Sequence, residues 1–216
     1  MSAHAGAGPE HYAHLGRYRD PNSGRTVVKI LPGEYFCTVG DEIVATVLGS
    51  CVAVCIRDAQ LGIGGMNHFM LPSPSGGSSS GWQAIAGRAA RYGCDAMQHL
   101  LDAVLGSGAT RSALEIKMFG GARVLTQMTD VGARNIAFAR RYFVEHALRL
   151  AAEDVGGWTP RLVQFCPRSG LARVRHLRSG SNDSVLAAER DYRAQLDGQN
   201  PVRQRNGDEA NPRLHR

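Results

Sequence analysis

The chain has 216 residues, a length that favours one sizeable hydrophobic core with flanking tails over two domains. Hydrophobic residues make up 43% and charged residues 20%, which excludes a chain that is disordered throughout. The net charge of +6 comes mainly from Arg and is compatible with nucleic acid, a membrane surface or an acidic protein partner.

Three further absences narrow the class of protein. The five cysteines, an odd number without regular spacing, argue against a disulfide framework. No stretch approaches the ~18 apolar residues of a membrane span, and residues 1–25 lack the apolar segment of a signal peptide. These features predict a reduced, cytoplasmic protein without membrane insertion.

The first part of the chain is predicted to be rich in β-strands. Residues 1–25 are rich in Gly, Ala and His without a period, so we expect a disordered tail there. Three apolar stretches follow, each ending at Gly or at Pro-Gly, and each is typical of a strand: Thr26–Leu31, Glu34–Val39 and Ile43–Leu48.

A sharp turn at Gly49-Ser50 ends the third strand and presents Cys51 at its tip. Backbone N–H groups from Ser50 to Val52 would point into the same space, as an oxyanion hole requires. Cys51 is therefore a candidate nucleophile. The alternative is a buried cysteine that acts as a small hydrophobic residue, which is the commoner role of a free thiol.

His68 follows on a second apolar run broken by glycines. Val52–Ile56 and Met66–Leu71 are predicted to pair as neighbouring strands, which would bring the imidazole to the thiol of Cys51. An imidazole raises the fraction of thiolate and can later protonate a leaving group. The alternative for His68 is a core or edge histidine with satisfied hydrogen bonds.

Two helices are predicted beyond this region. The Gly/Ser-rich segment Ser73–Gln83 is expected to be a loop, either a lip of the active site or a spacer. Ile85–Leu105 carries an apolar stripe at helical spacing, and a second helix is predicted from Gly132 to Ala151 with Asn135 or the preceding Gly as its cap.

Between these helices, Leu114–Phe119 is predicted to be a strand that ends at Gly120-Gly121. The two glycines either make a tight turn or expose backbone N–H groups to the substrate. After the second helix, the carboxylate pair Glu153-Asp154 has no further residues around it that would complete a metal site. We therefore expect no metal.

The last part of the chain is basic. Leu162–Cys166 and Leu171–Leu177 are predicted to form a closing hairpin. Arg161–Arg178 contains five Arg and no acidic residue, but it lacks the aromatic residues of a groove for single-stranded nucleic acid. A solvated face or a protein-docking patch is predicted instead. Residues 179–216 are polar, and we expect a disordered extension with a short helical possibility at Ala187–Leu196.

Strands and helices in mixed order place the chain in the α+β class. Five motifs in a consistent order, covering about Gly33 to Leu177, resemble the chemoreceptor glutamine deamidase family, CheD. They are LGSCVAVCIRD at 48–58, GIGGMNHFMLP at 62–72, FGGARV at 119–124, VGARN at 131–135 and AEDVGG at 152–157.

The resemblance implies stacked mixed β-sheets with two main helices packed outside, similar to a bacterial toxin deamidase. A single domain over residues 26–178 would lie between the tails 1–25 and 179–216. The resemblance further implies that Cys51 is the nucleophile and His68 the general acid/base, and it permits Gly49, Asn67, Gly120 and Gly121 to line the substrate site.

The resemblance also implies a threonine as third catalytic residue, just upstream of the cysteine. The position that aligns, six before Cys51, is Ala45, and Thr46 is its neighbour. Adjacent residues on a strand point to opposite faces, so Thr46 fills the role only if the register shifts by one.

The expected activity is hydrolytic deamidation of glutamines on methyl-accepting chemotaxis receptors through a Cys thioester, with a receptor methyl-esterase side activity. The resemblance implies no cofactor and a CheC-type phosphatase as a partner. The alternative function is a non-catalytic chemotaxis adaptor that docks through Arg161–Arg178. Nucleic-acid binding through the Arg-rich tail is a weaker third hypothesis, and we expect no nucleic-acid partner.

Overall fold

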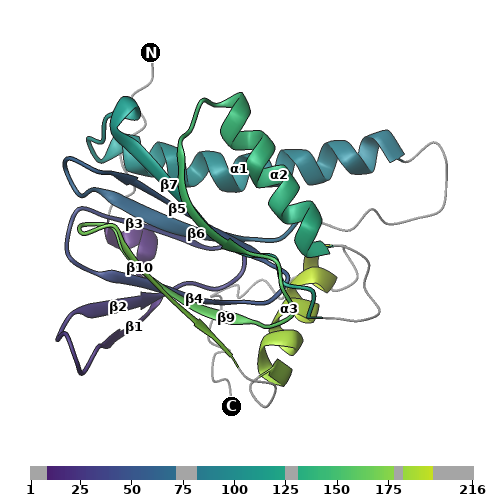
Figure 1. The fold of residues 1–216 in the computed structure, drawn as a ribbon, viewed down its shortest axis with the longest axis horizontal. Coiled ribbons are helices and arrows are strands. Elements are labelled where there is room, and N and C mark those ends of the chain that lie inside the picture. Colours follow the sequence, from purple (N-terminus) through teal and green to yellow (C-terminus); the bar gives the residue numbers. More distant parts are fainter. Residues whose placement is uncertain (1–8, 72–81, 125–130, 178–181, 197–216) are drawn as a thin grey trace, which may run out of the picture.

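The computed structural model describes residues 9–71, 82–124, 131–177 and 182–196. Two five-stranded sheets lie on one another, with α1 (Trp82–Gly106) and α2 (Val131–Glu145) on the outer side of one of them (Figure 1). A third helix, α3 (Asn182–Leu196), lies beside the other sheet near one end of the stack. The α+β class and the stacked sheets predicted from the sequence are confirmed. The predicted disordered extension over residues 179–216 is wrong for residues 182–196, which form α3 and bury Glu189, and α3 includes the short helix considered at Ala187–Leu196.

The first sheet has the strand order β1-β2-β4-β9-β10. Only β2 and β4 run parallel, and the other neighbours are antiparallel. The closing hairpin predicted from the sequence is confirmed as β9 and β10. The bounds are β1 Gly16–Arg19, β2 Thr26–Lys29, β4 Ile43–Leu48, β9 Arg161–Cys166 and β10 Leu171–His176.

The second sheet has the order β3-β6-β5-β7-β8. The predicted pairing of the two runs around Cys51 and His68 is confirmed, because β5 and β6 are antiparallel neighbours with Ala53 opposite His68. The bounds are β3 Tyr35–Thr38, β5 Val52–Asp58, β6 Gly64–Phe69, β7 Leu114–Gly120 and β8 Leu150–Val155. Short 3₁₀ helices cover Pro9–Tyr12 and Arg111–Ala113.

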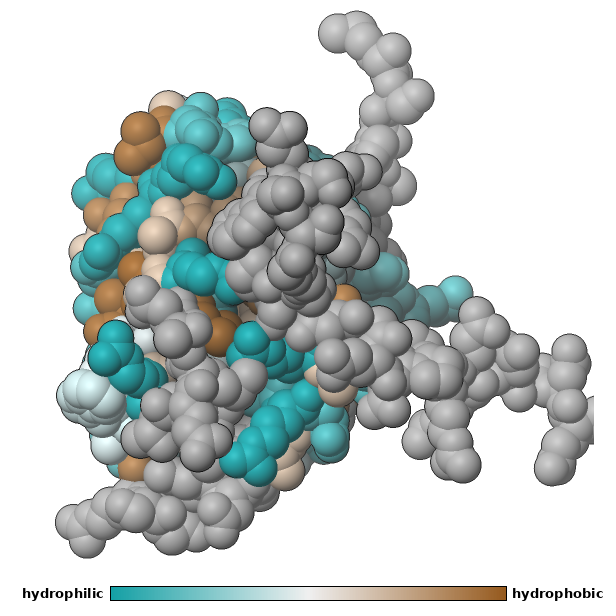
Figure 2. Space-filling view, turned by 90° about the vertical axis from the view of Figure 1, so that its right-hand side faces the viewer, coloured by the Kyte–Doolittle hydropathy of each residue, from teal (hydrophilic) through white to brown (hydrophobic). Residues whose placement is uncertain are grey.

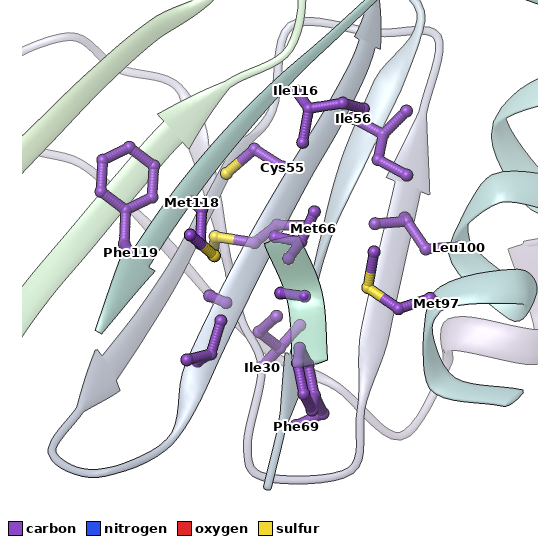
Figure 3. Packing of buried hydrophobic residues seen from close by; sticks show 14 of the residues in the cluster. Ile30, Cys55, Ile56, Met66, Phe69, Met97, Leu100, Ile116, Met118 and Phe119 are labelled. Atoms are coloured by element: carbon purple, nitrogen blue, oxygen red, sulfur yellow. The ribbon is translucent and has the colours of Figure 1, made fainter. Parts of the chain in front are cut away.

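Apolar side chains fill both faces of the second sheet. Alternation along β5 sends Ile56 toward Leu100 of α1 and Cys55 to the opposite face, on the same side as Met66, its partner on β6 (Figure 3). At ~25 cal/mol per Å² of apolar surface, these two layers supply most of the driving force for folding. In the described part of the chain no helix is long and apolar enough to cross a membrane.

The predicted disordered tail over residues 1–25 is wrong for residues 9–25. Tyr12 and Leu15 are buried in the main core, and β1 pairs with β2 from Gly16 to Arg19. The two apolar side chains anchor this segment, although the composition around them is typical of disorder. Residues 1–8 lie outside the described part.

The second helix is shorter than predicted, since α2 ends at Glu145 and β8 begins at Leu150. Val144, an apolar residue in the last turn of α2, is 81% exposed. Ala147 takes a positive φ of 52°, which ends the helical path and directs the chain into the sheet. The apolar residues after Glu145, which were predicted to continue the helix to Ala151, therefore belong to a turn and to the start of β8.

The basic stretch is not a continuous surface patch. Arg161 is 1% exposed and pairs with Asp154, and it also donates to the carbonyl of Gly156. Arg173 and Arg175 are exposed on one face of β10, as predicted. On the face seen in Figure 2, the described residues alternate between hydrophilic and hydrophobic, without a large continuous hydrophobic area.

Candidate active site

The turn from Gly49 to Cys51 joins the two sheets, because β4 belongs to the first sheet and β5 to the second. Cys51 is fully buried at this crossing. Residues that directly follow β7 support the turn from behind. Gly121 N–H donates to the carbonyl of Cys51 at 2.7 Å, and Ala122 N–H donates to the carbonyl of Gly49 at 2.7 Å.

Gly120 has a positive φ of 104°, and a Cβ there would collide with the Cys51 carbonyl oxygen. The N–H of Gly121 is bound to the same carbonyl. Gly121 also lines a surface pocket, and Ser50 is among the other residues that line this pocket. Gly120 and Gly121 were predicted either to make a tight turn or to expose their N–H groups to the substrate. The Gly121 N–H fits the first interpretation, because it is bound to the Cys51 carbonyl. Lining of the substrate site by the rest of Gly121 stays a prediction.

His68 on β6 points between the sheets and meets Thr46 on β4. The Thr46 hydroxyl lies 2.8 Å from His68 Nδ1 and donates to the carbonyl of Ile30 at 2.8 Å. Because that hydroxyl proton is given to Ile30, His68 Nδ1 is the donor in the other bond, which leaves Nε2 as the acceptor. Nε2 is buried and has no hydrogen-bond partner among the described residues.

The sulfur of Cys51 and a ring nitrogen of His68 lie within 4.8 Å of each other. Thr46 thus lies where a threonine could orient the His68 ring. Ala45 does not, because adjacent residues on a strand point to opposite faces. Ala45 points to the opposite face of β4, where it packs with Val27, Ile43 and Cys166.

Backbone N–H groups of Gly49, Ser50 and Cys51 converge on one point, and the carboxylate of Glu189 on α3 lies there. Its Oε1 accepts from Gly49 at 2.8 Å and from Cys51 at 3.1 Å. Its Oε2 accepts from the N–H of Ser50 at 2.9 Å and from the hydroxyl of Ser50 at 2.8 Å. The predicted donors ran from Ser50 to Val52, and the observed donors run from Gly49 to Cys51, one residue earlier.

Burial controls the charge of the two reactive groups. Burial raises the pKa of the Cys51 thiol well above its usual range, and the nearby Glu189 carboxylate raises it further. Burial lowers the pKa of His68 to about 4, against the opposite effect of Glu189. At neutral pH the pair is therefore a thiol beside a neutral imidazole.

Cys51, His68 and Glu189 also offer one thiol, one imidazole and one carboxylate to a common point. Zn²⁺ accepts all three kinds of ligand, so among the described residues this cluster is the one with a metal-binding donor set. Both oxygens of Glu189 already accept hydrogen bonds from the turn, and no metal enters the function proposed below.

Asn67 does not join the cluster. Its side chain lies on the opposite face of β6, where it accepts from Val54 N–H at 3.0 Å and donates to the carbonyl of Ala96 on α1 at 3.0 Å. This placement follows from strand alternation, because Asn67 and His68 are neighbours. Asn67 thus ties α1 to the second sheet. The predicted loop Ser73–Gln83 lies outside the described residues up to position 81.

Asn135 is a residue of the site that sequence reasoning assigned wrongly. It lies within α2 rather than at its cap, is fully buried, and donates from Nδ2 to the carbonyl of Ser50 at 2.9 Å. Its Oδ1 accepts from Leu71 N–H at 2.9 Å. One amide thus holds the cysteine turn and the end of the His68 strand together. The only sequence signal was a polar residue on an otherwise apolar helix face.

Asn135→Ala is expected to lower the free energy of unfolding by about 2–4 kcal/mol, because it leaves two buried backbone groups without partners. Urea denaturation followed by circular dichroism measures the change. Arg141→Ala on the exposed face of the same helix is the control, and its salt bridge with Glu145 accounts for less than about 1 kcal/mol. Equal stability of the two variants would show that Asn135 does not hold the turn.

Comparison with known proteins places this fold among chemotaxis proteins. A family model described as "CheD chemotactic sensory transduction" matches residues 70–176. A protein of Halorhodospira halophila named "Probable chemoreceptor glutamine deamidase CheD" is 48% identical over 189 residues, covering 87% of each chain. Proteins of the same name from Hahella chejuensis and Hydrogenovibrio crunogenus are 44% and 42% identical, covering 86% and 80% of this chain and 86% and 89% of their own lengths.

The chain belongs to the CheD family.

Proposed function

We propose that this chain hydrolyses glutamine side chains of chemoreceptors to glutamate, through a thioester on Cys51. The names of its relatives support the reaction class and the substrate. The observation that carries the proposal is the meeting, at one turn, of a thiol, an imidazole with a free acceptor nitrogen, and three convergent N–H groups.

In the first step the Cys51 thiol gives its proton to Nε2 of His68 while the sulfur forms a bond to the amide carbon of the glutamine. The amide oxygen becomes an oxyanion. The N–H groups of Gly49, Ser50 and Cys51 receive it, because the Glu189 carboxylate marks where they converge. Thr46 holds the ring in the tautomer that this transfer needs.

In the second step the C–N bond breaks, and the His68 imidazolium gives its proton to the departing nitrogen, which leaves as ammonia. Water then attacks the thioester with His68 as the base, the S–C bond breaks, and the sulfur recovers its proton. The products are glutamate and free Cys51. These steps use side chains, backbone N–H groups and water.

The reaction would replace a neutral amide by a negative charge on a receptor helix. A charge on a helix surface changes its side-chain pairing and packing, so the equilibrium between signalling states shifts. The same thioester can form from a glutamate methyl ester with release of methanol, so a methyl-esterase side activity belongs to the proposal. A CheC-type phosphatase partner and a cytoplasmic location remain predictions from the family resemblance.

The test is to incubate the wild-type chain with a receptor cytoplasmic fragment in ¹⁸O-water and to map the peptides by mass spectrometry. We expect specific glutamines to become glutamates that carry one ¹⁸O atom, because water opens the thioester. The fragment without the enzyme is the control. If the receptor fragment binds but no glutamine is converted, the adaptor function replaces the enzymatic one.

A further inference from the structure

Glu189 is the residue of α3 that enters the active site. It is 3% exposed, whereas its neighbours Ala188 and Arg190 are exposed. A buried carboxylate is costly unless its oxygens are fully hydrogen-bonded. Here four bonds from three consecutive residues of the cysteine turn satisfy both oxygens. The helix thus delivers one acidic side chain to the N–H groups beside Cys51.

The chemistry of this side chain is that of a reaction product. Deamidation of a glutamine leaves a glutamate, and its carboxylate would lie where the N–H groups of the turn had held the oxyanion. Glu189 presents that group, on a helix, to those donors and within 4.8 Å of the Cys51 sulfur.

Two side chains of α3 fit against the protein because the residues beneath them are glycines, which have no Cβ. A Cβ on Gly49 would lie 2.8 Å from the Glu189 carboxylate, and a Cβ on Gly33 would lie 2.6 Å from the Tyr192 hydroxyl. Tyr192 lies three residues after Glu189, on the same side of the helix, and its hydroxyl bonds that of Tyr92 on α1. Two contacts one helical turn apart therefore fix the helix over the site.

Docking of α3 also makes the thiol unreactive. The carboxylate of Glu189 lies within 4.8 Å of the buried Cys51 sulfur, and it adds to the rise of the thiol pKa. A thiol without access to solvent or substrate cannot attack an amide. The docked arrangement is therefore a resting form.

We infer that α3 is an autoinhibitory helix that binds the active site as an internal product analogue, with Glu189 in the position of the product glutamate. The inference rests on the proposed function. The groove that holds α3 is then the groove for the receptor helix, and it accepts a glutamine followed at the third position by a large aromatic or apolar residue. Substrate binding requires α3 to leave.

The first experiment converts the product analogue into a substrate. In Glu189→Gln, the Cys51 thiol is expected to deamidate the introduced glutamine within the same chain, at a rate independent of protein concentration. Peptide mapping after expression and during incubation would find glutamate at position 189. The double variant with Cys51→Ala is expected to keep the introduced amide. Gln195, exposed on the same helix, is the internal control and should stay glutamine in both proteins.

The second experiment removes the contact. Glu189→Ala is expected to react with iodoacetamide at Cys51 at least ~10-fold faster than wild type, and with its rate midpoint at lower pH, because a negative charge beside the thiol is gone. Deamidation of the receptor fragment should rise in parallel. Arg190→Ala, on the exposed side of the helix, is the matched control.

The outcomes separate this inference from the proposed function. If the amide introduced by Glu189→Gln persists, or if the alkylation rate of Glu189→Ala equals that of wild type, the inference is overturned, and receptor deamidation by wild type would still uphold the proposed function. If the introduced amide is converted and alkylation accelerates while no receptor glutamine changes, the autoinhibitory role of α3 stands, and the receptor helix falls both as the substrate and as the occupant of the α3 groove.

Discussion

Cys51→Ala is expected to lower the rate of receptor deamidation by at least about 10⁴-fold, because no other group at the turn can form the thioester. The measurement is the appearance of glutamate in mapped receptor peptides over time. Cys55→Ala is the matched control. Cys55 lies on the adjoining strand β5, is also buried, and is opposite Met66 rather than His68, so its variant should lose some stability and keep its rate.

A Cys51→Ala protein that retains the wild-type rate would rule out the covalent route. A Cys55→Ala protein that loses its activity while its fold is intact would show that the rate responds to core packing around β5 rather than to the nucleophile. Circular dichroism spectra of both variants distinguish a lost side chain from a lost fold.

His68→Gln is expected to reduce the deamidation rate by about 10²–10⁴-fold, since both proton transfers lose their carrier. The variant should also lose most of the reactivity of Cys51 toward iodoacetamide near neutral pH. Thr46→Val keeps the ring but removes the bond to Nδ1, so we expect a smaller fall of about 10-fold. His99→Gln on the exposed face of α1 should leave the rate unchanged.

The pH dependence of the wild-type rate provides a second check on His68. Its pKa lies at about 4 in the docked form because burial opposes the charge. A lowered pKa means that the ring is neutral, and can accept the thiol proton, above that value. We therefore expect the rate to fall on acidification, at the pH where the ring takes up a proton in the form that α3 has left. If the rate of the His68→Gln variant still falls on acidification, a group other than His68 causes the fall.

The pairing of Cys51 with His68 could be predicted because it depends on local signals. A Gly-Ser turn ends one apolar strand, and two apolar runs close together in the chain pair as neighbours. The choice between Ala45 and Thr46 could not be made, because sequence alternation gives the two faces of a strand but not which of them meets the second sheet. The bond to His68 Nδ1 decides it.

The residues that sequence reasoning missed act over long separations. Glu189 contacts Gly49 across 140 positions, and Asn135 contacts Ser50 across 85. Neither separation leaves a periodic signal, and an acidic residue in a polar, Arg-rich segment is typical of a solvated tail. The prediction for the buried Arg161 was wrong for the same reason, because its partner Asp154 lies on a different sheet.

Thr46 belongs to one sheet, His68 to the other, and Cys51 to the turn between them. In the proposed mechanism, the alignment of these three side chains is thus set by how far apart the two layers lie and by how they slide over each other. A substitution deep between the sheets, far from any substrate contact, can change the turnover rate without touching a catalytic side chain. If the proposed function holds, the hydrophobic core is in that sense part of the catalytic apparatus, and changes in its packing are a route by which selection could tune the rate.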